Sequence, residues 1–194
     1  MKVWNYKDYD EYVDWQVKTN LAKEGAIWVD ETTVEKICKG LSEEPSNIIC
    51  HGTRNGKEQQ YFKKFFPNCY VIGTEISPSA TKYEMTVQHD FNIQKKEWIG
   101  KFDILYSNSF DHSFEPMKTM KVWSEQLIQG GFIFFEYGYD INDNRSRPED
   151  PVELYMNDIL KLLEKNGIQY QTEFETVAFR KRRNSKIIVG KKCE

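Results

Sequence analysis

Side chains that could bind a charged, sugar-bearing ligand follow two apolar segments of the chain. The first segment, residues 47–50, leads into a turn that contains two glycines, Gly52 and Gly56. The turn consists of His51, Gly52, Thr53, Arg54, Asn55 and Gly56. The second segment, residues 69–74, ends at Glu75, which Ile76 follows. Glycine permits positive φ and close approach of a ligand, and free N–H groups at the start of a helix favour an anion. The turn therefore predicts a carboxylate or phosphate site, and Glu75 predicts an acceptor for the two hydroxyls of a ribose.

The elements around these residues explain how they would meet. Residues 47–50 have the composition of a buried strand, and residues 56–66 predict a helix with Tyr61, Phe62, Phe65 and Phe66 on one face. Residues 69–74 predict a second strand, parallel to the first. Because a crossover helix returns the chain to the same edge of the sheet, we expect Glu75 beside the glycine turn.

Two classes of nucleotide-binding protein use such a turn, and the spacing separates them. Dinucleotide-binding proteins use Gly-x-Gly-x-x-Gly, which this chain lacks, since Arg54 and Asn55 stand between Gly52 and Gly56. The pattern instead resembles motif I of the class I methyltransferases that use S-adenosylmethionine, usually acid-x-Gly-x-Gly-x-Gly. Cys50 stands in place of the acid and Arg54 in place of the middle glycine.

The order of the later segments also resembles that family. Residues 86–90 look like a third strand ending in an acid, residues 102–108 like a fourth, and residues 127–135 like a helix end, a Gly-Gly turn and a fifth strand. The tail, residues 169–191, suits a closing hairpin. The resemblance, which runs from about residue 31 to the C-terminus, implies an α/β fold: a three-layer α/β/α sandwich with a Rossmann-like, seven-stranded, mostly parallel sheet and an antiparallel C-terminal hairpin.

The length of 194 residues predicts one domain, with a core from residue 31 onward and a helical extension or lid over residues 1–30. Helices are expected over residues 8–23, 31–41, 116–129 and 151–165. The N-terminal aromatic residues could cover the cofactor as a lid, but we favour packing against the sheet for most of Trp4, Tyr6, Tyr9, Tyr12 and Trp15.

The resemblance implies roles for residues at the carboxyl edge of the sheet. Residues 52–56 would hold the methionine part of S-adenosylmethionine, Glu75 the ribose, and Asp90 the adenine. Structural alternatives are a solvated carboxylate for Glu75 and a turn residue for Asp90. The predicted cofactor-binding residues are His51, Gly52, Thr53, Arg54, Asn55, Gly56, Glu75, Ile76, His89, Asp90, Phe91, Ser107 and Asn108.

Methyl transfer to a hydroxyl requires a base near the acceptor. The polar segment 107–113 offers Asp111 and His112 as catalytic residues; alternatively, both cap the helix that begins near Pro116. The three histidines and three acids expected at this edge could hold a divalent metal. Their spacings match no metal-binding motif, so we expect none.

The charge balance argues against some partners. Twenty-seven Lys and Arg against 30 Asp and Glu give a net charge of −3, which makes nucleic acid an improbable partner. No apolar segment suggests a membrane span, and the four cysteines lack pairing motifs, so a cytoplasmic protein is expected. The polar loop 137–151 is the predicted acceptor-binding segment.

These observations predict an S-adenosylmethionine-dependent methyltransferase. The chain lacks the Asp/Asn-Pro-Pro-Tyr/Phe signature of many enzymes that methylate amino groups, so we expect O-methylation of a small-molecule or glycan-like, sugar-bearing acceptor. One alternative is a module or subunit that binds S-adenosylmethionine without transferring its methyl group. A second is a nicotinamide-dependent oxidoreductase.

Overall fold

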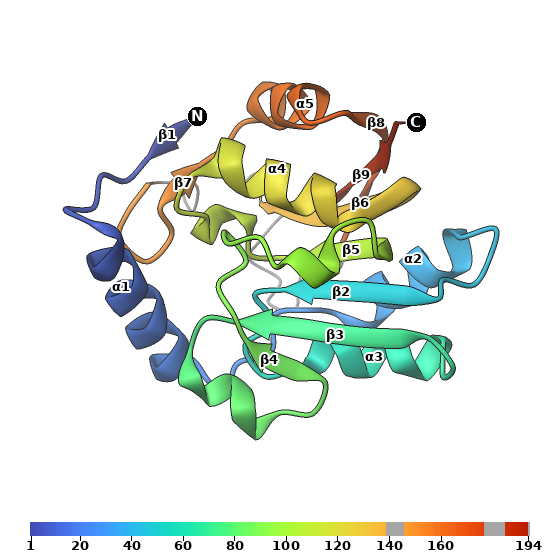
Figure 1. The fold of residues 1–194 in the computed structure, drawn as a ribbon, viewed down its shortest axis with the longest axis horizontal. Helices are drawn as coiled ribbons and strands as arrows, with labels where there is room; N and C mark the ends of the chain where they lie inside the picture. Colours follow the sequence, from blue (N-terminus) through green and yellow to red (C-terminus); the bar gives the residue numbers. More distant parts are fainter. Residues whose placement is uncertain (139–145, 177–184, 194) are drawn as a thin grey trace.

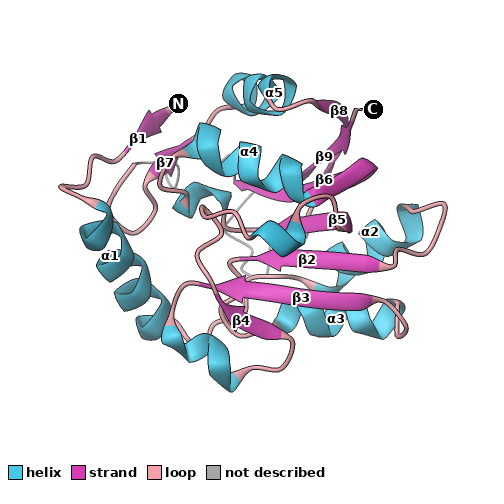
Figure 2. Cartoon of the chain, in the orientation of Figure 1, coloured by secondary structure: helices cyan, strands magenta, loops and turns pink. Residues whose placement is uncertain are grey.

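Seven strands form one sheet in the computed structural model, which describes residues 1–138, 146–176 and 185–193. Figures 1 and 2 show the sheet at the centre of the molecule. Its spatial order is β4 (Thr86–Gln88), β3 (Tyr70–Glu75), β2 (Asn47–His51), β5 (Phe102–Ser107), β6 (Leu127–Gly138), β9 (Ser185–Lys192) and β8 (Ile168–Glu175). The pairs from β4 to β6 are parallel, whereas β9 runs antiparallel to both β6 and β8. The predicted mostly parallel sheet with an antiparallel hairpin is confirmed.

Two pairs of helices cover the faces of this sheet. One face packs against α2 (Glu31–Gly40) and α3 (Lys57–Phe65), and the other against α4 (Pro116–Gln126) and α5 (Met156–Lys165). The apolar residues Val34, Ile37 and Cys38 of α2 recur at helical spacing and are buried. The central strands β2 and β5 are buried on both faces, which explains why they read as continuous apolar runs. The three-layer arrangement is therefore as predicted.

Two predicted helix boundaries were wrong. The helix expected to reach Gln129 ends at Gln126, because β6 begins at Leu127. The helix expected from Pro151 begins only at Met156, since β7 (Val152–Glu153) pairs antiparallel with β1 (Lys2–Val3). The N–H of Trp4 also donates to the carbonyl of Pro151 at 2.7 Å. This pairing joins segments about 150 residues apart, which local sequence patterns do not reveal.

The N-terminal helix α1 (Tyr9–Ala22) lies across the carboxyl ends of β2 and β3 (Figure 1). Its first turn is capped by Asp8, whose side chain accepts from the N–H of Glu11 at 2.9 Å. The buried residues of α1 are mostly polar, namely Tyr12, Gln16, Thr19 and Asn20. Since a helix that covers a core buries apolar side chains, α1 covers a polar region instead. Within the described ranges, no helix has the length and apolar character needed to span a membrane.

Candidate cofactor and acceptor site

The glycine turn between β2 and α3 requires left-handed backbone at three positions. Gly52 and Gly56 have φ of 71° and 70°, and Arg54 between them has φ of 47°. A Cβ added to Gly52 would lie 2.6 Å from the Cβ of Ser109, so only glycine fits there. An arginine in the left-handed region costs about 1 kcal/mol of backbone strain. Arg54, which stands where motif I usually has its middle glycine, thus has a backbone conformation that favours glycine although it carries a long cationic side chain.

Glu75, at the end of β3, lies against this turn. Its Oε2 accepts from the backbone N–H of Arg54 and its Oε1 from that of Ser77, both at 3.0 Å. The side chain is 5% exposed, which excludes the alternative of a solvated carboxylate. Burial raises the pKa of Glu75, and the two N–H donors partly offset that rise. A carboxylate offers about four acceptor sites, so two remain for ligand hydroxyls.

Two adjoining cavities open at this edge of the sheet. The larger has a volume of about 230 Å³ and the smaller about 40 Å³. Both are lined by Gly52, Arg54, Ser109 and His112. Further predicted residues divide between them, with Thr53, Asn55, Asn108 and Asp111 at the larger cavity and Glu75, Ile76, Asp90 and Phe91 at the smaller. Residues predicted to bind the cofactor thus line two adjoining spaces.

The N-terminal helix lines one side of the smaller cavity. Asp90 accepts from the hydroxyl of Tyr9 at 2.5 Å through Oδ2, and from the backbone N–H and side-chain amide of Asn92 through Oδ1. The bond to the Asn92 N–H is the turn contact that was the alternative for Asp90. Residues Tyr12, Gln16, Thr19 and Asn20 of α1 line the same space. The carboxylate of Asp90 is thus already bound by Tyr9 and Asn92 in this structure, and a ligand donor at Asp90 would compete with the Tyr9 hydroxyl.

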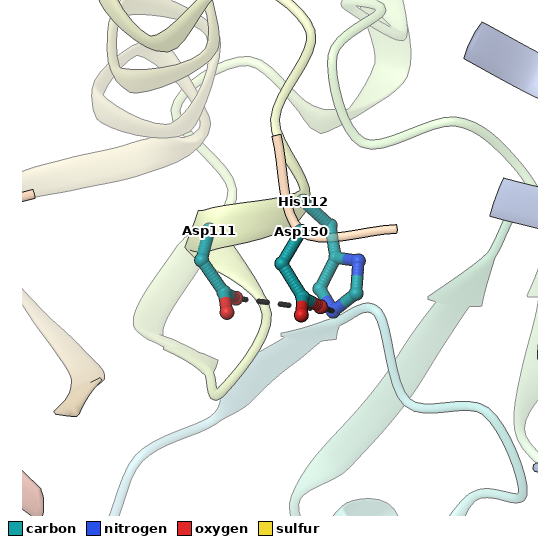
Figure 3. Close-up of side chains that lie close together, drawn as sticks. All are labelled: Asp111, His112 and Asp150. Carbon is teal, nitrogen blue, oxygen red and sulfur yellow. Dashed lines mark ion pairs between the residues drawn. The ribbon is translucent and has the colours of Figure 1, made fainter. Parts of the chain in front are cut away.

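A histidine with two carboxylates lies at the junction of the cavities. Asp111 and His112 form a short 3-10 turn (Phe110–His112), which Phe110 anchors by packing on Trp123. The Nε2 of His112 lies 3.9 Å from Asp111 Oδ1 and 3.6 Å from Asp150 Oδ1 (Figure 3). The predicted alternative, that this pair caps the next helix, is wrong. The N-cap residue of α4 is Glu115, and no side chain caps it.

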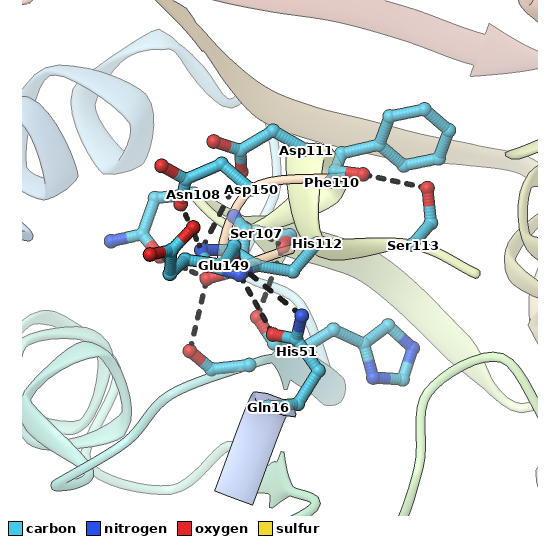
Figure 4. A network of polar contacts seen from close by, with 12 residues as sticks. Gln16, His51, Ser107, Asn108, Phe110, Asp111, His112, Ser113, Glu149 and Asp150 are labelled. Atoms are coloured by element: carbon cyan, nitrogen blue, oxygen red, sulfur yellow. Dashed lines mark hydrogen bonds and ion pairs between the residues drawn. The ribbon is translucent and has the colours of Figure 1, made fainter. Parts of the chain in front are cut away.

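The tautomer of His112 follows from its second contact. Gln16 Oε1 lies 2.9 Å from Nδ1 of His112, while the Gln16 amide nitrogen faces the carbonyl oxygens of Pro148 and Glu149 at 3.4 Å (Figure 4). Carbonyl oxygens only accept, which assigns the amide nitrogen to that side and leaves Oε1 as an acceptor. Nδ1 of His112 therefore carries a hydrogen, and Nε2 faces Asp111 and Asp150.

Asp150 is the more buried of the two carboxylates. Burial raises its pKa, but its interaction with His112 and the hydrogen bond and charge of Arg147 outweigh burial and hold that pKa below its ordinary value. Ligand atoms of Asp111, His112 and Asp150 lie within 4.8 Å of one another, a separation that a divalent cation could bridge. Arg147 pairs with the other oxygen of Asp150, so this cluster carries less net negative charge than a metal site built mainly of carboxylates.

Four predicted cofactor residues do not line either cavity, namely His51, Gly56, His89 and Ser107. His51 is 1% exposed, with Nδ1 at 2.9 Å from Thr74 Oγ1 and Nε2 at 2.8 Å from Gln126 Oε1, and it stacks on Trp123. His89 bonds the carbonyl of Ile93, and Ser107 bonds that of His51. Side chains alternate across a strand, so His51, the last residue of β2, points into the core rather than toward the turn that follows. The three histidines expected at one edge do not gather there.

Three residues of the site were missed by the sequence analysis. Gln16 contacts His112 from a segment distant in the chain, and no local pattern identified it. Asp150 also contacts His112; it lies in the predicted acceptor loop 137–151 but was not singled out there. Glu58 lines the larger cavity from the first turn of α3 and is 4% exposed. It precedes the buried Phe62 by four residues, so a carboxylate on the buried face of the helix was a visible signal. Residues 139–145 of the predicted acceptor loop lie outside the described ranges; Arg147 of that loop lines the larger cavity.

The sequence matches no protein-family model and no curated protein. Several solved structures are similar. The 1,6-didemethyltoxoflavin-N1-methyltransferase of Burkholderia thailandensis, with bound 1,6-didemethyltoxoflavin and S-adenosylhomocysteine, gives a TM-score of 0.76 at 12% identity over 98% of this chain and 92% of that one. The cyclase SpnF gives 0.72 at 10% identity over 100% and 98%. The N-methyltransferase NodS of Bradyrhizobium japonicum gives 0.63 at 13% identity over 84% and 94%.

These likenesses agree with the mostly parallel sheet and the antiparallel C-terminal hairpin described above. They extend over nearly the whole chain in the first two cases. This chain has the fold of the class I methyltransferases.

Proposed function

We propose that this protein binds S-adenosylmethionine and transfers its methyl group to a hydroxyl of a small-molecule or sugar-like acceptor. The observation that carries the proposal is the pair of adjoining cavities, which share Gly52, Arg54, Ser109 and His112 and have Glu75 and Asp90 on one side. Binding of S-adenosylhomocysteine by the Burkholderia thailandensis enzyme of the same fold supports the choice of cofactor. SpnF, a cyclase, has the same fold, so the reaction is argued from the site.

The residues present fit this cofactor. The turn has left-handed backbone, and at Gly52 there is no room for a residue with a Cβ. A ligand can therefore approach the backbone closely there. Glu75 retains acceptor capacity for ribose hydroxyls beside that turn. Buried polar atoms of Arg54 and Glu58 lack hydrogen-bond partners in the larger cavity.

His112 is the residue that would activate the acceptor. When bound, S-adenosylmethionine supplies an electrophilic methyl group on its sulfonium. His112 Nε2 would take the proton of an acceptor hydroxyl, while Gln16 fixes the ring through Nδ1. Asp111 and Asp150 would stabilise the imidazolium that results. An aligned base and a held acceptor are what a hydroxyl nucleophile needs.

A turnover assay on the full chain tests the proposal. The protein would be incubated with S-adenosylmethionine and separate sets of hydroxyl and amine acceptors, with release of S-adenosylhomocysteine as the readout. We expect His112→Ala to lower kcat on hydroxyl acceptors by about 10²- to 10⁴-fold, with affinity for S-adenosylhomocysteine changed only a few-fold. His89→Ala, a histidine outside the cavities, is the matched control.

Three outcomes would contradict the proposal. Binding without turnover on any acceptor would favour a module or subunit that keeps the pocket. Tighter binding of a nicotinamide dinucleotide would favour an oxidoreductase. Turnover restricted to amines and unaffected by His112→Ala would refute the hydroxyl acceptor. Repeating the assay with a chelator tests whether a divalent cation at Asp111, His112 and Asp150 takes part.

A further inference from the structure

Glu58 presents an unpaired carboxylate oxygen in the larger cavity. Its Oε1 accepts from Nδ2 of Asn108 at 3.2 Å, whereas its Oε2 is buried without a hydrogen-bond partner. The residue is only 4% exposed and lines the cavity from the start of α3. A buried acceptor without a partner is costly, and a folded protein rarely keeps one without a function. A cationic donor in the cavity would satisfy Oε2.

Arg54 presents the opposite charge nearby. Its Nε and Nη1 are buried without partners, and its guanidinium lies 5.9 Å from the ring centre of Trp28. No ion pair joins Arg54 to Glu58, both of which the structure describes, so each retains binding capacity for a ligand. The strain of left-handed backbone at Arg54 is maintained at a position where glycine would carry none. Such an outlier suggests that the side chain has a function.

Cys50 cannot supply the carboxylate that the resembled motif usually has at this position, so another residue would have to supply it. It stands where the resembled motif usually has an acid, but it is 0% exposed within the core that α2 and α3 cover. Burial raises the pKa of the Cys50 thiol, so that position carries no charge at neutral pH. Glu58 lies eight residues further along the chain and faces the cavity instead.

We propose that Glu58 and Arg54 form the receptor for the amino-acid end of the cofactor, with Glu58 Oε2 accepting from the α-ammonium and Arg54 donating to the α-carboxylate. A zwitterion matches two unpaired groups of opposite sign that line one cavity. The inference rests on the proposed function, because it takes S-adenosylmethionine as the ligand. It assigns to Glu58 the cation-binding role that motif I leaves empty in this chain.

Near neutral pH, binding of the ammonium group to Glu58 would release a proton from its carboxyl group. Burial raises the pKa of Glu58 to about 8, while its own backbone N–H, Asn108 and Arg54 lower it and Glu75 raises it further. The thiol of Cys50 and the phenols of Tyr61 and Tyr106 are the other titratable groups that interact with Glu58. The ammonium binds only the ionised carboxylate, so affinity is full above this pKa and is lost as the pH falls through it. We expect affinity to rise about fivefold from pH 7 to pH 8.

Calorimetry on the full chain tests the receptor with two probes. S-adenosylhomocysteine has the amino-acid end, and 5′-methylthioadenosine lacks it. We expect Glu58→Gln to weaken binding of S-adenosylhomocysteine by about tenfold or more at pH 8, to leave 5′-methylthioadenosine unchanged, and to abolish proton release measured in buffers of different ionisation enthalpy. Arg54→Ala should show the same selectivity without abolishing proton release. The exposed Glu84→Gln variant is the matched control.

Each other result overturns the proposal. Equal weakening of both probes would mean that Glu58 only supports the fold of the site, and a thermal melt of each variant reports that directly. Unchanged binding of S-adenosylhomocysteine, or a raised KM for a cationic acceptor alone, would assign Glu58 to another ligand. If the unmodified protein binds neither probe, the proposed function itself fails, an outcome distinct from a Glu58→Gln variant that binds normally.

Discussion

The proposed adenosine end and the proposed amino-acid end of the cofactor site share Gly52 and differ in how their polar side chains are paired. At the adenosine end, the carboxylates of Glu75 and Asp90 accept hydrogen bonds from backbone N–H groups and, for Asp90, from Tyr9. At the amino-acid end, Glu58 and Arg54 have buried polar atoms without partners. The two cavities also differ in volume, about 40 against 230 Å³.

The difference indicates where binding free energy is gained. A ligand at the amino-acid end supplies missing partners and so removes an existing cost. An adenine that binds Asp90 would replace the bond from Tyr9 to that carboxylate, so part of its binding free energy would offset the loss of this bond. We therefore expect the amino-acid end to be formed in advance and the adenosine end to form on binding.

Removing the Glu75 carboxylate should have the largest effect on binding. Glu75→Ala is expected to weaken S-adenosylhomocysteine and 5′-methylthioadenosine alike by about 1.5–3 kcal/mol, because both contain the ribose. Calorimetry measures both constants, and a thermal melt checks that the glycine turn survives the loss of its two N–H bonds to Glu75. A loss confined to S-adenosylhomocysteine would place Glu75 at the wrong end and break the comparison.

A histidine outside both ends should affect stability rather than binding. Burial, opposed only partly by Gln126, lowers the pKa of His51 to about 3. Below the ordinary histidine pKa of about 6.5, His51 binds a proton in the unfolded chain but stays unprotonated in the folded protein. The His51 contribution to stability is thus complete above that pH and falls by about 1.4 kcal/mol per pH unit as the pH drops toward 3.

Denaturant unfolding at pH 6 and pH 5 measures this contribution. We expect the free energy of unfolding of His51→Gln to fall by about 1 kcal/mol less over that interval than that of the unmodified protein. Affinity for S-adenosylhomocysteine should stay the same at pH 7.5. A weaker affinity without loss of stability would return His51 to the cofactor site, where the sequence analysis had placed it.

The parts of the fold that local patterns encode could be predicted from the sequence. The apolar runs of β2, β3 and β5 and the spaced apolar residues of α2 identify these elements, and their order fixes the parallel sheet. The β1–β7 pairing was not predictable, because two-residue strands carry no periodicity and their partner is distant in the chain.

The site was predictable where it follows directly from a strand end, as for Gly52 and Glu75. It was not predictable where tertiary contacts decide, because Gln16 reaches His112 only through the placement of α1 across the sheet edge. His51 was placed wrongly for a related reason: adjacent residues at a strand end point in opposite directions, and sequence position does not say which of them points toward the cavity and which into the core. The weak apolar character of α1 was a sign that this helix covers a site.

The smallest effect is expected from the hydroxyl of Tyr9. Burial raises the pKa of Tyr9, so its hydroxyl stays protonated and donates a hydrogen bond to Asp90. Asp90 is the residue predicted to bind adenine. Tyr9→Phe removes the competing donor and keeps the ring that packs on Phe114. We expect tighter binding of 5′-methylthioadenosine by about 0.5–1.5 kcal/mol, the net contribution of one hydrogen bond.

The matched control is Tyr155→Phe, which removes a tyrosine hydroxyl that bonds a carboxylate, Glu153, outside the cavities. Affinity there should not change. Weaker binding in Tyr9→Phe would mean that the hydroxyl holds the nucleoside, and α1 would then belong to the binding surface as it stands. Equal affinity would mean that adenine does not compete for Asp90, so the adenosine end would already be formed and the contrast with the amino-acid end would rest on the unpaired atoms of Glu58 and Arg54 alone.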